Sequence, residues 1–210
     1  LTLYVDDVTV GGRSYDFAAK SGWEGVGARA TFRDAAIRPY HDFGYSDTAH
    51  AGGSVGEIGG LVWRIEEANI GEAAYYAVDV GGLTMDDQLY AAGRVAMTRA
   101  GAGSAVLIGW FDSRTFVGAP PASFLGVMVE GPSRVGHYFR PAYSNREGGV
   151  GVVSEGPVMR PSDRSFAWTL EYDPTADQGR GEITVALDDD RVSVPLDDGV
   201  RAVGASYDRF

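Results

Sequence analysis

Strict alternation of apolar and polar residues near the C-terminal end is the feature that most constrains the fold. The segment RSFAWTLEYD, residues 164–173, has an aromatic or aliphatic residue at every second position: Phe166, Trp168, Leu170 and Tyr172. Successive side chains of an extended strand point to opposite faces, so these four share one face. The pattern predicts a half-buried strand.

The next segment, GEITVALDDDRVSVPLDDG, repeats this alternation twice around a turn at 188–190. The residues in phase are Ile183, Val185 and Leu187 before the turn and Val192, Val194 and Leu196 after it. Two alternating runs joined by a short polar turn are typical of an antiparallel hairpin.

Similar patterns predict further strands along the chain. They cover 1–10, 13–17, 37–43, 57–64, 75–79, 94–98, 105–111, 124–130, 135–143 and 205–210. The 30 glycines among 210 residues, about twice the average usage of roughly 7%, are scattered between these runs and favour tight turns. A helical turn is predicted only in TMDDQLYAA, residues 84–92. We therefore expect an all-β fold, a two-sheet antiparallel β-sandwich, forming a single domain over 1–210.

Composition excludes several classes of partner and site. The chain has 29 Asp and Glu against 18 Lys and Arg, a net charge of −11 that repels nucleic acid and anionic membranes. It has no cysteine, which excludes thiolate metal sites and disulfides. No apolar run is long enough for a membrane helix, so we expect a protein that is either cytoplasmic or exported by a segment outside this sequence.

The opening strand LYVDDVTV changes its alternation at Asp6 and Asp7, which predicts a β-bulge there. It resembles the DDV strand of extracellular jelly-roll modules of the concanavalin A-like and carbohydrate-binding type, in which such an aspartate often helps to hold a structural calcium ion. Calcium prefers hard oxygen ligands, which Asp6, Asp7 and loop carbonyls could supply. The alternative is that paired aspartates simply mark turns.

Other segments extend the resemblance. DFGYSDTAHAGG, GEIGGLVWR, VEGPSRVGHYFRPAYS and WTLEYDP together resemble a group of uncharacterised secreted bacterial proteins. The whole chain resembles the concanavalin A-like lectin and glucanase superfamily. The resemblance implies a jelly roll, a secreted or cell-surface location, no organic cofactor, and a chain that could be a fragment of a longer protein.

Two stretches rich in polar residues are the candidate catalytic sites. The first is the glycine-rich stretch 40–60, with His50 and Glu57, and the second is 129–146, with Glu130 and His137. HYFRPAY in the second stretch faintly resembles a signature of jelly-roll alginate lyases. In β-elimination on a uronate, arginine or histidine would neutralise the sugar carboxylate and tyrosine would move the protons.

Glycoside hydrolysis is the second possible reaction, and it needs two carboxylates that face each other across a groove. Glu57 and Glu130 are the best pair, because each lies at the end of a predicted strand.

The sequence thus predicts an extracellular protein that recognises a polysaccharide or oligosaccharide on a concave sheet face and could cleave it as a lyase or glycoside hydrolase. The predicted catalytic residues are His50, Glu57, Glu130, His137 and Tyr138. The predicted sugar-binding residues are Tyr45, Asp47, Trp63, Trp110, Arg114, Arg134, Arg140 and Tyr143. A non-catalytic carbohydrate-binding module and an extracellular structural or adhesive domain are the alternatives. An enzyme predicts histidines and carboxylates that converge on one cavity, and a binding module predicts an aromatic platform with the histidines elsewhere. A structural or adhesive domain predicts neither.

Overall fold

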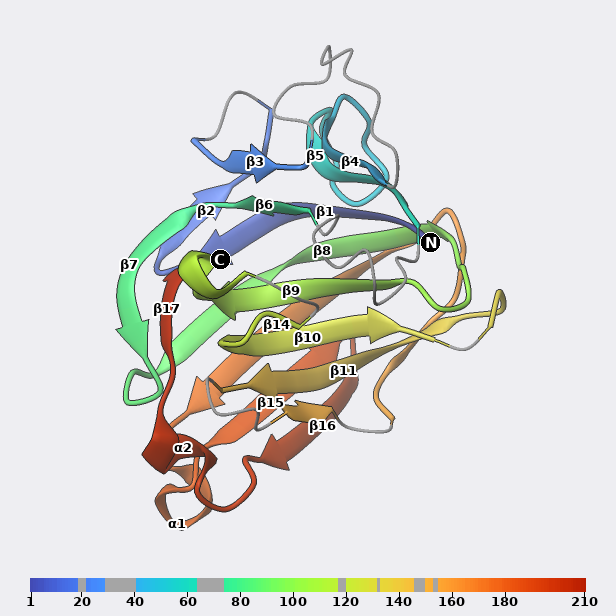
Figure 1. Cartoon of the computed structure of the whole chain (residues 1–210). Coiled ribbons are helices and arrows are strands. Elements are labelled where there is room, and N and C mark those ends of the chain that lie inside the picture. The colour runs from blue at the N-terminus through green and yellow to red at the C-terminus, as the bar shows by residue number, and fades with distance from the viewer. Residues whose placement is uncertain are drawn as a thin grey trace.

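The computed structural model shows two large antiparallel β-sheets that share one core (Figure 1). It describes residues 1–18, 22–28, 41–63, 74–116, 120–131, 133–145, 150–152 and 155–210. The predicted all-β, two-sheet architecture is confirmed.

The larger sheet has eight strands, in the order β16-β15-β14-β8-β1-β5-β4 with β2 beside β1. The bounds are β1 (Thr2–Val10), β2 (Arg13–Tyr15), β4 (His41–Ser46), β5 (Glu57–Val62), β8 (Leu89–Arg99), β14 (Ser165–Asp173), β15 (Glu182–Leu187) and β16 (Asp190–Pro195). The predicted strand at 164–173 is β14, and β15 and β16 form the predicted hairpin. The predicted strands 37–43 and 57–64 correspond to β4 and β5 as far as they fall on described residues.

The second sheet has seven strands, in the order β12-β11-β10-β9-β17-β7 with β13 beside β11. The bounds are β7 (Asp79–Thr84), β9 (Ala105–Phe111), β10 (Phe124–Glu130), β11 (His137–Ser144), β12 (Val150–Val152), β13 (Val158–Met159) and β17 (Ser206–Arg209). The bounds of β9 and β10 coincide with the predicted ranges.

Short elements complete the described fold. β3 (Glu24–Val26) pairs with β6 (Tyr75–Ala77), and single turns form η2 (Ser113–Thr115), α1 (Ala176–Gly179) and α2 (Val200–Val203). The helical turn predicted in 84–92 is wrong, because β8 already begins at Leu89. The Asp87 carboxylate accepts hydrogen bonds from the backbone N–H of Thr84 at 2.8 Å and from its hydroxyl at 2.9 Å, which stabilises a tight turn instead.

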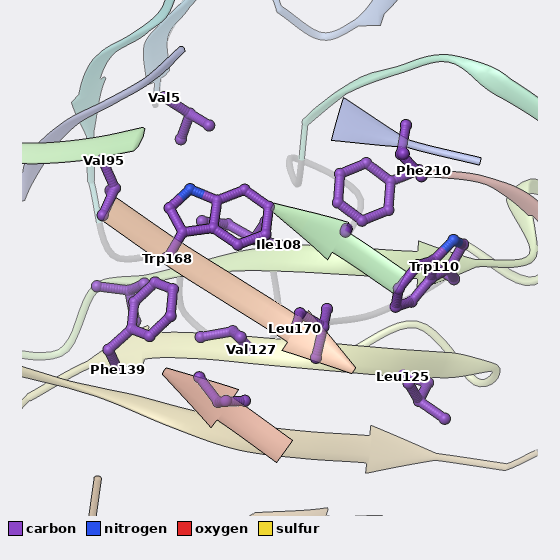
Figure 2. Packing of buried hydrophobic residues seen from close by; sticks show 14 of the residues in the cluster. Val5, Val95, Ile108, Trp110, Leu125, Val127, Phe139, Trp168, Leu170 and Phe210 are labelled. Atoms are coloured by element: carbon purple, nitrogen blue, oxygen red, sulfur yellow. The ribbon is translucent and has the colours of Figure 1, made fainter. Parts of the chain in front are cut away.

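Inward-facing side chains of both sheets form the core. Trp168 from β14 is 1% exposed, and its ring centroid lies 6.5 Å from that of Phe139 in β11 (Figure 2). Trp110 from β9 packs edge-on against Phe210, with 5.2 Å between ring centroids. The period-two alternation in the sequence therefore indicates which side of each strand faces the other sheet.

The seven-stranded sheet also has apolar side chains on its outer face. Phe111, Phe124 and Met128 are buried in a second cluster, against which Leu107 and Phe116 pack. An antiparallel sheet with one solvated face alternates apolar and polar residues, so an apolar outer face needs another explanation. It forms part of the candidate site described below.

The predicted bulge in β1 is confirmed. The register between β1 and β8 shifts between Asp6 and Thr9, and Asp7 has a φ of 51°. No helix within the described part of the chain is long and apolar enough to cross a membrane.

Candidate functional site

A cavity of ≈ 470 Å³ lies beside β9 among the described residues. Its lining comes from β1, β4, β5 and β6 of the first part of the chain and from β9, β10 and β11 of the second. Cavities of this size, mostly apolar with a few polar groups, are typical sites for small molecules and sugar units.

Aromatic side chains make up much of the wall. The rings of Tyr75, Phe111 and Phe116 contact one another, with centroids 5.0 Å apart for Tyr75 and Phe116 and 5.2 Å for Tyr75 and Phe111. Trp63, at the end of β5, also lines the cavity and is 56% exposed. Burial raises the pKa of Tyr75, helped by the negative charge of Glu24, so this phenol stays neutral and can both donate and accept hydrogen bonds.

One ion pair gives the cavity its polar end. Arg140 of β11 donates to the Glu130 carboxylate of β10, and both side chains line the cavity. The Glu130 side chain is 36% exposed and that of Arg140 is 17% exposed, so the pair lies at the boundary between wall and solvent. A carboxylate beside a guanidinium offers both acceptors and donors to a ligand.

Glu57, a predicted catalytic acid, is instead buried beneath its own loop. It is 0% exposed, and its carboxylate accepts hydrogen bonds from the Thr48 hydroxyl, from the His50 N–H at 2.9 Å and from the Ala51 N–H at 2.8 Å. These bonds close the 47–56 loop between β4 and β5. The described geometry gives this carboxylate a structural role and no access to the cavity.

His50 lies on the outer face of the eight-stranded sheet, with Glu57. It is exposed, and its ring centroid is 4.3 Å from that of Tyr4 in β1. Asp6 lies under the same loop, 1% exposed, and a Cβ added at Gly52 would overlap its carboxylate. Desolvation raises the pKa of Asp6 to about 7, and the nearby carboxylates of Asp7, Glu57 and Asp16 act in the same direction.

His137 and Tyr138 lie on opposite faces of β11. His137 is 1% exposed, its Nε2 lies 3.1 Å from the Gly101 carbonyl oxygen, and burial lowers its pKa. Tyr138 is half-buried opposite Glu130, outside the lining of the cavity. The five predicted catalytic residues are therefore divided among three places, and Glu130 is the member of the set that reaches the cavity.

Of the eight predicted sugar-binding residues, Trp63 and Arg140 line the cavity. Trp110 and Tyr143 are buried in the core, at 1% and 4% exposure. The Tyr143 hydroxyl accepts a hydrogen bond from the Asp197 N–H at 3.0 Å, and burial raises the pKa of Tyr143 to about 12.

The other four predicted sugar-binding residues lie elsewhere. Arg114 is held by Asp112 through bonds of 2.8 and 2.9 Å. Arg134 and Asp47 are exposed outside the lining of the cavity, and Tyr45 packs against the core.

Asp6 and Asp7 were the expected calcium ligands. Among the residues that the structure describes, no three His, Asp or Glu side chains are grouped so as to hold a metal ion. Calcium takes 6–8 oxygen ligands, so two aspartates would need several carbonyl or water oxygens beside them. A calcium ion here stays a prediction, which thermal unfolding with added calcium and with EDTA would test.

Phe111, Phe116 and Leu107 were not predicted as site residues. A signal for Leu107 and Phe111 is present in the sequence, because AVLIGWF in β9 and FLGVMV in β10 are apolar at both parities. Strands of an antiparallel sheet that are apolar on both faces have something other than solvent on the second face.

Comparison with known proteins adds no assignment. No family model matches the chain. Neither a curated protein nor a solved structure matches it. The resemblance to concanavalin A-like sandwiches therefore stays a prediction.

Proposed function

We propose that this protein binds an oligosaccharide in the cavity beside β9 and does not cleave it. The observation that carries the proposal is the composition of the cavity wall: a cluster of aromatic side chains with the Glu130–Arg140 pair at one end. The extracellular location expected from the resemblance is part of the same proposal.

The aromatic wall suits the apolar faces of pyranose rings. Trp63 is the most accessible of these rings, because 56% of it is exposed, and it lines the same cavity as Phe111 and Phe116. Aromatic faces contribute about 1 kcal/mol to such contacts, while Glu130 and Arg140 could hydrogen-bond sugar hydroxyls.

Binding is favoured over catalysis because of where the proton-transfer groups lie. Retaining or inverting hydrolysis needs a second carboxylate roughly 5–10 Å from Glu130, and β-elimination needs a base near the sugar ring. Glu57 is enclosed by its loop, and His137 lies on the core side of β11. The Glu130 carboxylate is itself paired with Arg140. These positions support the binding-module reading.

Calorimetry with a panel of neutral and uronate oligosaccharides would test the proposal. We expect at least one of them to bind and to perturb tryptophan fluorescence, because Trp63 is the exposed one of the four tryptophans. Trp63→Ala should weaken binding about fivefold to tenfold, for a contact of about 1–1.4 kcal/mol. Tyr90→Ala is the matched control, since Tyr90 is 49% exposed in β8 and does not line the cavity.

Two results would contradict the proposal. If Tyr90→Ala weakens binding as much as Trp63→Ala, the ligand does not occupy the cavity. If new reducing ends or unsaturated uronates accumulate with a bound oligosaccharide, and Glu130→Gln abolishes them, the protein is an enzyme.

A further inference from the structure

The cavity extends around the edge of β9 from the outer face of its sheet to the core face. Leu107 and Phe111 point to the outer face, where they belong to the second apolar cluster. Val106 and Ile108 have the opposite parity and pack in the main core, yet both also line the cavity. A single strand therefore contributes both of its faces to one cavity.

The pairing of β9 explains how this is possible. On one side β10 pairs with β9 over its whole length, from Ala105 to Phe111. On the other side β17 pairs only at Phe111, and no described strand pairs with Ala105–Trp110. The cavity passes around this edge, which joins an outer part to an inner branch.

The inner branch is apolar. We define it by five lining residues that face the core: Val5, Val8, Ile58, Val106 and Ile108. They come from β1, β5 and β9 and are all aliphatic, while His41 of β4, a titratable side chain in phase with Ile58, also lines the cavity. The outer part, by contrast, contains the Glu130–Arg140 pair.

We propose that the ligand is a sugar that carries an apolar substituent, an alkyl chain or an aryl ring, which occupies the inner branch. This inference rests on the proposed sugar binding and names the class of sugar. The hydroxyls of the sugar lie by Glu130 and Arg140, and the substituent passes around the β9 edge to contact Ile58 and Ile108. A plain oligosaccharide has no group that gains free energy by leaving water for these five aliphatic side chains.

The affinity should increase with the length of the substituent. Burial of one methylene contributes about 0.8 kcal/mol, which corresponds to about a fourfold gain in affinity. The propyl glycoside has two methylenes more than the methyl glycoside, so we expect it to bind roughly fifteenfold more tightly.

The experiment is calorimetry with methyl, propyl, hexyl and phenyl β-glucosides, and with the same series on glucuronic acid. Hexanol and phenol, which lack the sugar, are measured beside them. The alkyl and phenyl arms distinguish a chain from a ring as the natural substituent.

Variants of Val106 test whether the increase in affinity with chain length arises in the inner branch. Val106→Phe should fill the branch and abolish the dependence on chain length. Val192→Phe is the control, because Val192 is likewise half-buried against the core but lies in β16, outside the cavity. If Val106→Phe does not fold, as judged by circular dichroism, Val106→Ala replaces it and should instead favour the hexyl over the propyl glycoside more than the wild type does.

The outcomes separate this inference from the proposed function. Affinity that rises with chain length in the wild type and in Val192→Phe, and not in Val106→Phe, supports the inference. Equal binding of the methyl, propyl, hexyl and phenyl glycosides overturns the inference and leaves sugar binding intact. Hexanol or phenol that binds as tightly as its glycosides overturns sugar recognition itself.

Discussion

Asp6 should make the stability of this protein depend on pH in a direction opposite to that of most carboxylates. Its side chain is 1% exposed under the 47–56 loop, and its Oδ1 has no hydrogen-bond partner among the described residues. Desolvation raises the pKa of Asp6 to about 7, from 3.8 for an ordinary aspartate. The proposed perturbation is Asp6→Asn, a neutral side chain of nearly the same shape.

The sign follows from proton binding. Between pH 4 and pH 7 the folded protein holds a proton on Asp6 that the unfolded chain has lost, so stability falls as the pH rises through this range. One pKa unit is worth about 1.4 kcal/mol, so the upper bound for this shift is about 4 kcal/mol. Solvent screening reduces it, and we expect about 1–2 kcal/mol between pH 5 and pH 8.

The measurement is the free energy of unfolding in urea at pH 5, 6, 7 and 8, in buffer with EDTA so that no bound cation contributes. All other titrating groups are common to both proteins, including Asp7, Asp16 and Glu57, which surround Asp6. The difference between wild type and Asp6→Asn therefore isolates one carboxyl group, and Asp6→Asn should gain stability relative to wild type as the pH rises.

Two results would refute this reasoning. A difference that stays constant from pH 5 to pH 8 would mean that Asp6 does not titrate in this range when folded. A wild type that becomes more stable relative to Asp6→Asn as the pH rises would mean that the ionised carboxylate is stabilised in the folded protein, by Arg94, which lies opposite Asp6 on β8.

Three further predictions concern stability. Glu57→Ala should destabilise the fold by about 3–5 kcal/mol in urea unfolding, because the buried donors of its loop lose a charged acceptor. Glu57→Gln should cost less, and equally small effects of both variants would exclude the structural role. Trp168→Ala should lower the free energy of unfolding by about 3–5 kcal/mol and Tyr90→Ala by less than about 0.5 kcal/mol, since Trp168 is 1% and Tyr90 is 49% exposed. Similar urea midpoints for the two variants would contradict this packing. Gly126→Ala should lower the thermal midpoint strongly, because a Cβ there would overlap the Ile108 backbone carbonyl. A Cβ at Gly53 meets nothing within 4 Å, so Gly53→Ala should be neutral. A stable Gly126→Ala would show that β9 and β10 can separate.

The strands were predictable because the side-chain period of a strand is two residues. Where one parity is apolar and the other polar, as in 164–173, local sequence and burial agree, and the predicted and observed strands coincide. The turn at 84–88 was not predictable in the same way, because side-chain bonds from Asp87 decide it and composition there also suits a helix.

The site was predicted less well, for two physical reasons. Stretches rich in polar residues predict a catalytic site, but Glu57 satisfies the backbone of its own loop, and His137 faces the core because of its parity in β11. The cavity itself is built from residues far apart in the sequence, such as Trp63 and Phe116. Which of them meet depends on how the two sheets pair, and local sequence does not specify this.

The loop closed by Glu57 has a practical consequence. The bonds from Glu57 hold Thr48, His50 and Ala51, and the Gly56 N–H donates to the Thr48 carbonyl at 3.0 Å. The tip at 53–55 takes no part in these bonds and is exposed, with Val55 at 60%. A fluorophore or an immobilisation tag attached at the tip would leave the base of the loop intact. It would also project from the sheet face opposite the core, away from the cavity, so a labelled protein would keep its binding site open.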